Sequence, residues 1–148
     1  MAKTPTLPRI GLILTEDAIS MDHPHLMGRQ SAGHGFLRAC LNHASLRERI
    51  TLVTPNDKSR DAVRKVVKEC LPGNAKDTSL PELNLQKVSA WNTLDVLHMP
   101  APISSQQLVQ RGVHRLDGLS LSGVTHTISS ASVVQQLSAY VREPTRQS

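Results

Sequence analysis

Two histidines each follow a short apolar run of the kind that forms a β-strand. His126 lies in the stretch Gly-Val-Thr-His-Thr at 123–127, and His98 lies in Val-Leu-His-Met at 96–99. In a parallel α/β sheet the carboxyl ends of the strands meet at one edge, where ligands bind. We therefore expect both imidazoles near one crevice, where they could take part in catalysis. The alternative for each is an ordinary hydrogen-bonded structural histidine.

A glycine-containing stretch, Gly-Arg-Gln-Ser-Ala-Gly-His-Gly at 28–35, precedes an expected helix. Glycines at a helix start let a phosphate approach the backbone N–H groups and the positive end of the helix dipole. As a dinucleotide fingerprint the pattern fails, because Arg38 occupies the third glycine position and the first strand ends far upstream. Close packing of a glycine-rich helix start explains the stretch about equally well.

Other chemistry-bearing residues give weaker signals. Glu16 and Asp17 follow the first expected strand, where a carboxylate could serve as a general base, although a solvated loop is the favoured interpretation. His23 and His25 flank a proline and lack an evident third ligand, so we expect no metal. The chain contains no Gly-x-Ser-x-Gly elbow and no P-loop, which argues against a hydrolase of that fold and against an NTPase.

The elements that must position these residues alternate between strands and helices. Strands are expected at 9–15, 50–54, 85–91, 96–99 and within 119–127, and helices at 30–44, 59–71, 104–111 and from Ser129 or Ser130 onward. Residues 16–28 and 74–84 are expected to be loops. This alternation predicts an α/β, Rossmann-like, doubly wound fold with a mostly parallel sheet and the first strand at its centre. We expect a flexible tail at 1–8 and one domain at 9–148.

Composition supports this fold class. Hydrophobic residues make up 39% of the 148 residues but aromatic ones only 2%, as in Val/Ile-rich strands covered by Leu/Ala-rich helices. Cys40 and Cys70 fall on apolar helix positions, so we expect reduced thiols rather than a disulfide. In helix 30–44, the spacing predicts one buried face, formed by Gly33, Phe36, Leu37, Cys40 and Leu41.

The charge balance points to anionic partners without naming one. Lys and Arg number 17 against 12 Asp and Glu, a net charge of +5, which would favour an anionic ligand, an acidic membrane surface or a nucleic acid. The basic residues are spread along the chain and aromatics for base stacking are scarce, so we expect no nucleic-acid partner. No long apolar segment predicts a signal peptide or a membrane span, and we expect a cytoplasmic protein.

Three segments in order resemble a known family. The glycine stretch leading into 36–41, the segment His-Met-Pro-Ala-Pro at 98–102, and the stretch 123–127 are similar to the N-terminal domain of GT-B glycosyltransferases, specifically the retaining, family-4-like group. The resemblance covers most of the chain from Arg9 onward. It implies one of two Rossmann-like domains that face a cleft. It also implies sugar transfer from a nucleotide-sugar donor, which is a substrate, with no metal or other cofactor.

The resemblance also implies roles for particular residues. Gly28 would lie near the donor phosphate, and Arg29 stands where the family has a second glycine, so it could attract phosphate or close the loop. His126 would be the catalytic residue, pointing toward the donor sugar. His98 and Thr127 would lie on the acceptor side of the cleft.

The family's C-terminal features are missing from this sequence. No sixth strand, interdomain linker or pair of glutamates eight positions apart is present. We therefore expect an acceptor-side domain with little activity alone, completed by a C-terminal domain on a partner chain. The alternative is a non-catalytic Rossmann-like binding or regulatory module. A dinucleotide-using enzyme is a weaker third option.

Overall fold

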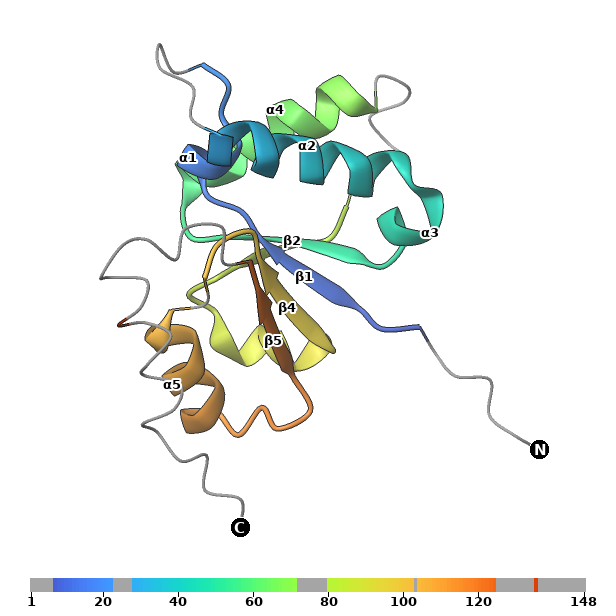
Figure 1. Cartoon of the computed structure of the whole chain (residues 1–148). Helices are drawn as coiled ribbons and strands as arrows, with labels where there is room; N and C mark the ends of the chain where they lie inside the picture. The colour runs from blue at the N-terminus through green and yellow to red at the C-terminus, as the bar shows by residue number, and fades with distance from the viewer. Residues whose placement is uncertain (1–6, 23–27, 72–79, 103, 125–134, 136–148) are drawn as a thin grey trace, which may run out of the picture.

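The computed structural model describes residues 7–22, 28–71, 80–102, 104–124 and 135. Its strands form one all-parallel sheet in the order β3-β2-β1-β4-β5, with β1 in the centre (Figure 1). The strands are β1 (Ile10–Ile13), β2 (Ile50–Thr54), β3 (Glu82–Asn84), β4 (Val96–Met99) and β5 (Ser120–Gly123). The mostly parallel, Rossmann-like sheet predicted from the sequence is confirmed.

Helices cover both faces of this sheet. On one face lie α1 (Glu16–Ile19), α2 (Gly28–Asn42) and α4 (Asp57–Cys70), with the short α3 (Ala44–Arg47) following α2 (Figure 1). The 3₁₀-helix η1 (Val88–Thr93) and the helix α5 (Ser105–Val113) lie on the opposite face. The doubly wound arrangement is therefore confirmed.

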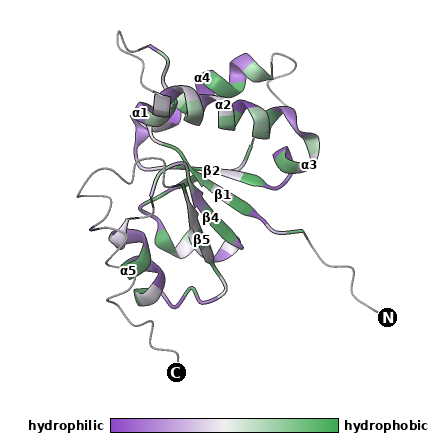
Figure 2. Ribbon diagram, in the orientation of Figure 1, coloured by the Kyte–Doolittle hydropathy of each residue, from purple (hydrophilic) through white to green (hydrophobic). Residues whose placement is uncertain are grey.

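Two hydrophobic clusters hold the layers together, one on each face of the sheet. Leu12 belongs to the cluster under α2 and α4, whereas its neighbour Ile13 belongs to the cluster under η1, because successive strand side chains alternate between faces. β1 and β2 are coloured largely as hydrophobic in Figure 2, as expected for strands covered on both sides. These two central strands therefore contribute side chains to both clusters.

The third strand was predicted at 85–91, and this prediction is wrong. The strand is β3, inside the segment expected to be a loop, and a short turn leads from it into η1. Val88 and Trp91 are three residues apart, which places them on one side of η1, and both pack in the second cluster together with Leu85 from the turn. β3 is a short edge strand in which only Leu83 is partly buried, so its hydrophobic signal is weak.

Two further predictions need correction. Residues 16–28, expected to be a loop, include the helix α1, and α2 begins at Gly28. On α2, Leu37, Cys40 and Leu41 are buried as predicted, but Phe36 is 39% exposed. Phe36 lies at the edge of the buried face, where its ring meets β4 rather than the core beneath the helix. The predicted final helix, and the end of the fifth strand beyond residue 124, lie outside the described residues.

The contact between α1 and α2 is tight at Gly33. A Cβ atom built there would lie 2.1 Å from the backbone carbonyl oxygen of Ala18, which cannot move without shifting α1. At Gly35, two residues along the same helix, a Cβ atom would meet nothing within 4 Å.

We expect opposite effects from Gly33→Ala and Gly35→Ala in urea unfolding. Gly33→Ala should lower the free energy of unfolding by about 1–3 kcal/mol, because the helices must separate. Gly35→Ala should raise it by about 0.4–1 kcal/mol, because alanine restricts the unfolded chain and favours helix. Equal effects of the two substitutions would contradict this packing of α1 against α2.

Candidate functional site

The candidate site is the point where the strand order reverses. The chain runs from β1 outward to β2 and β3, then returns to β4 on the other side of β1. In open α/β sheets the crevice outside the carboxyl ends of two such strands is the usual ligand site. In this chain that position lies between residues 15–17 after β1 and residues 100–102 after β4.

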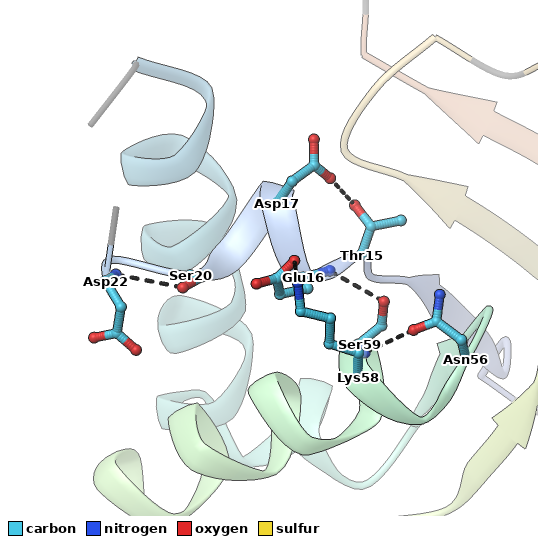
Figure 3. Close-up of polar contacts among 8 residues, drawn as sticks. All are labelled: Thr15, Glu16, Asp17, Ser20, Asp22, Asn56, Lys58 and Ser59. Atoms are coloured by element: carbon cyan, nitrogen blue, oxygen red, sulfur yellow. Dashed lines mark hydrogen bonds and ion pairs between the residues drawn. The ribbon is translucent and has the colours of Figure 1, made fainter. Parts of the chain in front are cut away.

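Thr15 and Asp17 lie just beyond β1. The Thr15 hydroxyl donates a hydrogen bond to Oδ1 of Asp17 at 2.8 Å, so the exposed carboxylate is oriented by its own helix start (Figure 3). Glu16 and Asp17 form the acidic first turn of α1. A phosphate placed there would meet like charges, although the helix start following the first strand is where Rossmann domains commonly hold one.

Glu16 is tied into the scaffold. Its backbone N–H donates to Oγ of Ser59 at 3.1 Å, and Ser59 is 2% exposed at the start of α4. Oδ1 of Asn56 in turn accepts from the Ser59 backbone N–H at 2.9 Å, which caps α4 (Figure 3). The Glu16 carboxylate pairs with the exposed Lys58 ammonium at 3.1 Å. Glu16 therefore holds the starts of α1 and α4 together.

His98 lies inside β4, one residue before the strand ends. It pairs in register with Leu12 and Ser122, so its side chain lies on the face of the sheet that α2 covers. Its Nδ1 is 3.1 Å from Oγ of Ser122, and its ring lies 5.3 Å from the Phe36 ring, centroid to centroid, at an interplanar angle of 41°. Burial lowers the pKa of His98 below its ordinary value. The imidazole is therefore neutral at neutral pH, with one donor and one acceptor nitrogen.

This position refines the expectation for His98. Thr15 lies three residues beyond Leu12, the strand partner of His98, and therefore about 10 Å further along the sheet. His98 thus lies at the side of the crevice, on the sheet face beside Phe36, and not at its tip. Its predicted role on the acceptor side stays a prediction.

Gly28 and Arg29 are the first two residues of α2 rather than part of a loop. Gly28 is exposed, and a Cβ atom built there would meet nothing within 4 Å, so no close approach within the protein requires a glycine. The predicted phosphate contact at Gly28 and Arg29 stays a prediction. His126 and Thr127 lie outside the described residues, as do His23 and His25.

The two cysteines lie on α2 and α4. Cys40 is buried and Cys70 half-buried, and both are free thiols, as predicted. Burial raises the pKa of the Cys40 thiol, so it is a poor nucleophile. Across the described part of the chain, no three His, Cys, Asp or Glu side chains gather into a group that could hold a metal ion.

Sequence reasoning missed three contributors to this edge: the buried Ser59, the ring of Phe36 and the hydroxyl of Ser122. The spacing Asn56-x-x-Ser59 ahead of a helix is a capping signal that could have revealed the first. The contacts of His98 with the other two depend on the register of β4 with β5 and on the packing of α2, which no local pattern encodes.

Comparisons with known proteins found no match to this chain among protein-family models, curated proteins or solved structures. The Rossmann-like fold therefore rests on the strand order and the two helical layers. Within the described ranges, no helix has both the length and the apolar character needed to cross a membrane.

We expect Phe36→Ala to raise the pKa of His98 toward its ordinary value. The smaller side chain would admit water to the imidazole, and water stabilises the protonated form. An NMR titration of the His98 ring in both proteins measures the change, with Phe36→Leu as the control that keeps the site covered. An unchanged pKa in Phe36→Ala would show that another group buries the ring.

His98 should also link stability to pH. Because the folded chain holds this histidine with a pKa below the ordinary value of 6.5, the unfolded chain binds the proton more tightly. The free energy of unfolding should therefore decrease as the pH falls below 6.5 and be unaffected by His98 above it. Urea unfolding at a series of pH values should show a shallower decrease in His98→Gln than in His43→Gln, a substitution at an exposed histidine.

Proposed function

We propose that the crevice at the carboxyl ends of β1 and β4 binds a small hydroxyl-bearing molecule of the sugar class. The observation that carries this proposal is the Asp17 carboxylate, held by the Thr15 hydroxyl beside the switch point of the sheet. A carboxylate accepts hydrogen bonds from sugar hydroxyl groups, and the neutral imidazole of His98 can donate or accept one. Both groups can therefore form hydrogen bonds with the hydroxyl groups of a sugar.

The charge at this edge supports a neutral ligand over a phosphate on the β1 side. The first turn of α1 carries Glu16 and Asp17. The Lys58 ammonium is already paired with Glu16. A ligand phosphate would thus need another binding element. The start of the 15-residue helix α2, at Gly28 and Arg29, is the element whose dipole would favour it.

The fuller proposal is that this chain is the acceptor-side domain of a retaining GT-B glycosyltransferase. The resemblance of its three segments supports this activity, and the parallel sheet is compatible with it. A C-terminal domain would supply most contacts to the nucleotide sugar. In that assembly His126 would be catalytic, Gly28 and Arg29 would face the donor phosphate, and His98 and Thr127 would line the acceptor side.

A non-catalytic binding or regulatory module is the second candidate. The observation in its favour is the acidic start of α1, which occupies the position where Rossmann enzymes commonly hold a phosphate. Under this proposal the sugar-class ligand is bound without being transformed.

Ligand binding is tested by titrating the chain with glucose, mannose and N-acetylglucosamine and following backbone NMR signals of 14–18 and 97–101. We expect saturable shifts confined to these two segments. Asp17→Asn should weaken binding about tenfold, because a hydrogen bond to a charged group is lost. Asp117→Asn, which neutralises an exposed carboxylate on the turn between α5 and β5, should leave binding unchanged. Equal losses in both variants, or no shift with any sugar, would contradict the proposed site.

The transferase proposal has a separate test. A GT-B C-terminal domain supplied in trans should restore sugar transfer from a nucleotide sugar, measured by mass spectrometry of the product. His126→Ala in the present chain should then abolish it. Transfer that survives this substitution would make the catalytic role of His126 wrong. Sugar binding without transfer in any combination would favour the non-catalytic module.

A further inference from the structure

The helix α5 turns a polar side toward the rest of the fold. Gln107 is only 6% exposed, and Arg111, one turn further along, donates from its Nε to the carbonyl oxygen of Leu119 at 2.7 Å. Gln107 and Gln110 also line a hollow of about 300 Å³ between α5 and η1, with Lys87 on the η1 side. Amide and guanidinium groups therefore face the fold along this side of α5.

Aliphatic side chains occupy the other side of α5. Val109 is 45% exposed and Val113, one turn later, is 70% exposed. With about 3.6 residues per turn, both point about 120° to 160° away from Gln107 around the helix axis. Gly112 lies on the same side, and a Cβ atom built there would meet nothing within 4 Å. Among the described residues, neither valine joins a hydrophobic cluster.

We call Val109, Gly112 and Val113 the valine face of α5. An amphipathic helix normally packs its aliphatic side against a neighbour and leaves its polar side to solvent. In α5 this order is reversed, since the buried Gln107 faces the fold and the valines are exposed. The valine face is therefore an interaction surface whose occupant must be apolar.

The segment 133–141 carries a matching aliphatic side. Its sequence, Val-Val-Gln-Gln-Leu-Ser-Ala-Tyr-Val, contains five large apolar residues, which on a helix fall within about a third of the circumference. Gln135, the residue of 125–148 that the structure describes, has a helical backbone and is exposed. On a helix Gln135 lies opposite Leu137 and the other apolar residues. Its exposure is therefore what a helix with a covered aliphatic side would give.

The chain can bring this segment to α5. The backbone N–H of Val124 donates to the carbonyl oxygen of Ala101 at 3.1 Å, and α5 begins at Ser105, four positions after Ala101. The chain therefore leaves β5 beside the start of α5. The nine residues that lead from Val124 to Val133 span up to about 30 Å when extended. The nine-residue helix α5 is about 14 Å long, so its whole valine face is within reach.

A tethered segment fits this small surface better than a separate chain does. A stable interface between two separate chains buries about 800 Å² on each partner, over about 20–30 residues. The valine face consists of three residues of one nine-residue helix. A segment of the same chain needs less contact area, because a short linker gives it an effective concentration in the millimolar range.

We propose that segment 133–141 packs as a helix on the valine face of α5. Leu137 lies over Gly112, where the missing side chain leaves room for it. This contact also holds residues 125–132 at both ends, between the hydrogen-bonded Val124 and the docked helix. His126 lies in this stretch, so its position depends on the docking.

Methyl NMR tests the contact directly. In the whole chain with ¹³C-labelled Val and Leu methyl groups, we expect NOEs from Leu137 to both Val109 and Val113. A sample mixed from labelled and unlabelled chains separates contacts within one chain from contacts between two copies. NOEs that arise only between copies would assign the valine face to a dimer and overturn the proposal. The absence of any NOE from Leu137 to α5 would also overturn it.

Amide hydrogen exchange tests the contact from the α5 side. Val113→Asp should speed exchange at 134–141 about tenfold or more, because a charge replaces an apolar contact. His114→Asp adds the same charge one residue along, on the side of α5 that lines the hollow, and should leave this exchange unchanged. Exchange in β1 and β2 should be the same in both variants, which checks that the fold is intact. Equal exchange at 134–141 in the two variants would contradict the docking.

Substitutions in the segment provide the reciprocal test. Leu137→Asp should shift the methyl signals of Val113, whereas Ser138→Asp, on the side of the helix that carries Gln135, should leave them in place. Adding Val113→Asp to Leu137→Asp should speed exchange at 134–141 no further, because the shared contact is already lost. Additive effects of the two substitutions would show that the residues act independently and would overturn the proposal.

Discussion

Every layer of this fold depends on the burial of β1 on both of its faces. Gly11 shows how little room is left: a Cβ atom built there would lie 2.6 Å from Cδ1 of Leu94 and 3.0 Å from Cδ1 of Leu97. The side chains of Leu94 and Leu97 therefore fill the space over Gly11, and the cluster under η1 reaches the centre of the sheet. The crevice at the carboxyl end of β1 takes its position from this constraint.

The two faces of the sheet then acquire different chemistry. On the α2 face a neutral histidine shares its environment with an aromatic ring and a hydroxyl group, and carboxylates stand at the end of the neighbouring strand. On the opposite face, donors and a cation surround a hollow without any carboxylate in its described lining. The two faces therefore differ in the charged and hydrogen-bonding groups that they carry.

Strong local patterns predicted the fold well, and weak ones failed. β2 and β4 have the predicted bounds because short β-branched or apolar runs ended by proline permit few alternatives. The strand predicted at 85–91 is a 3₁₀-helix, because apolar residues spaced by three also fit a strand when only hydrophobicity is considered. For the site, His98 was correctly placed near a strand end. Its contacts with Phe36 and Ser122 arise from packing between distant segments.

The division of the core into two clusters gives each face of the sheet its own reporter group. The buried thiol of Cys40 lies in the cluster under α2 and α4, and the sole tryptophan lies in the cluster under η1 and α5. The labelling rate of Cys40, followed separately from that of the half-buried Cys70, therefore measures how often the first face opens, and tryptophan emission measures the state of the second. Because β1 contributes to both clusters, the energetic coupling between the clusters through this strand decides whether the two faces open together or as separate folding units.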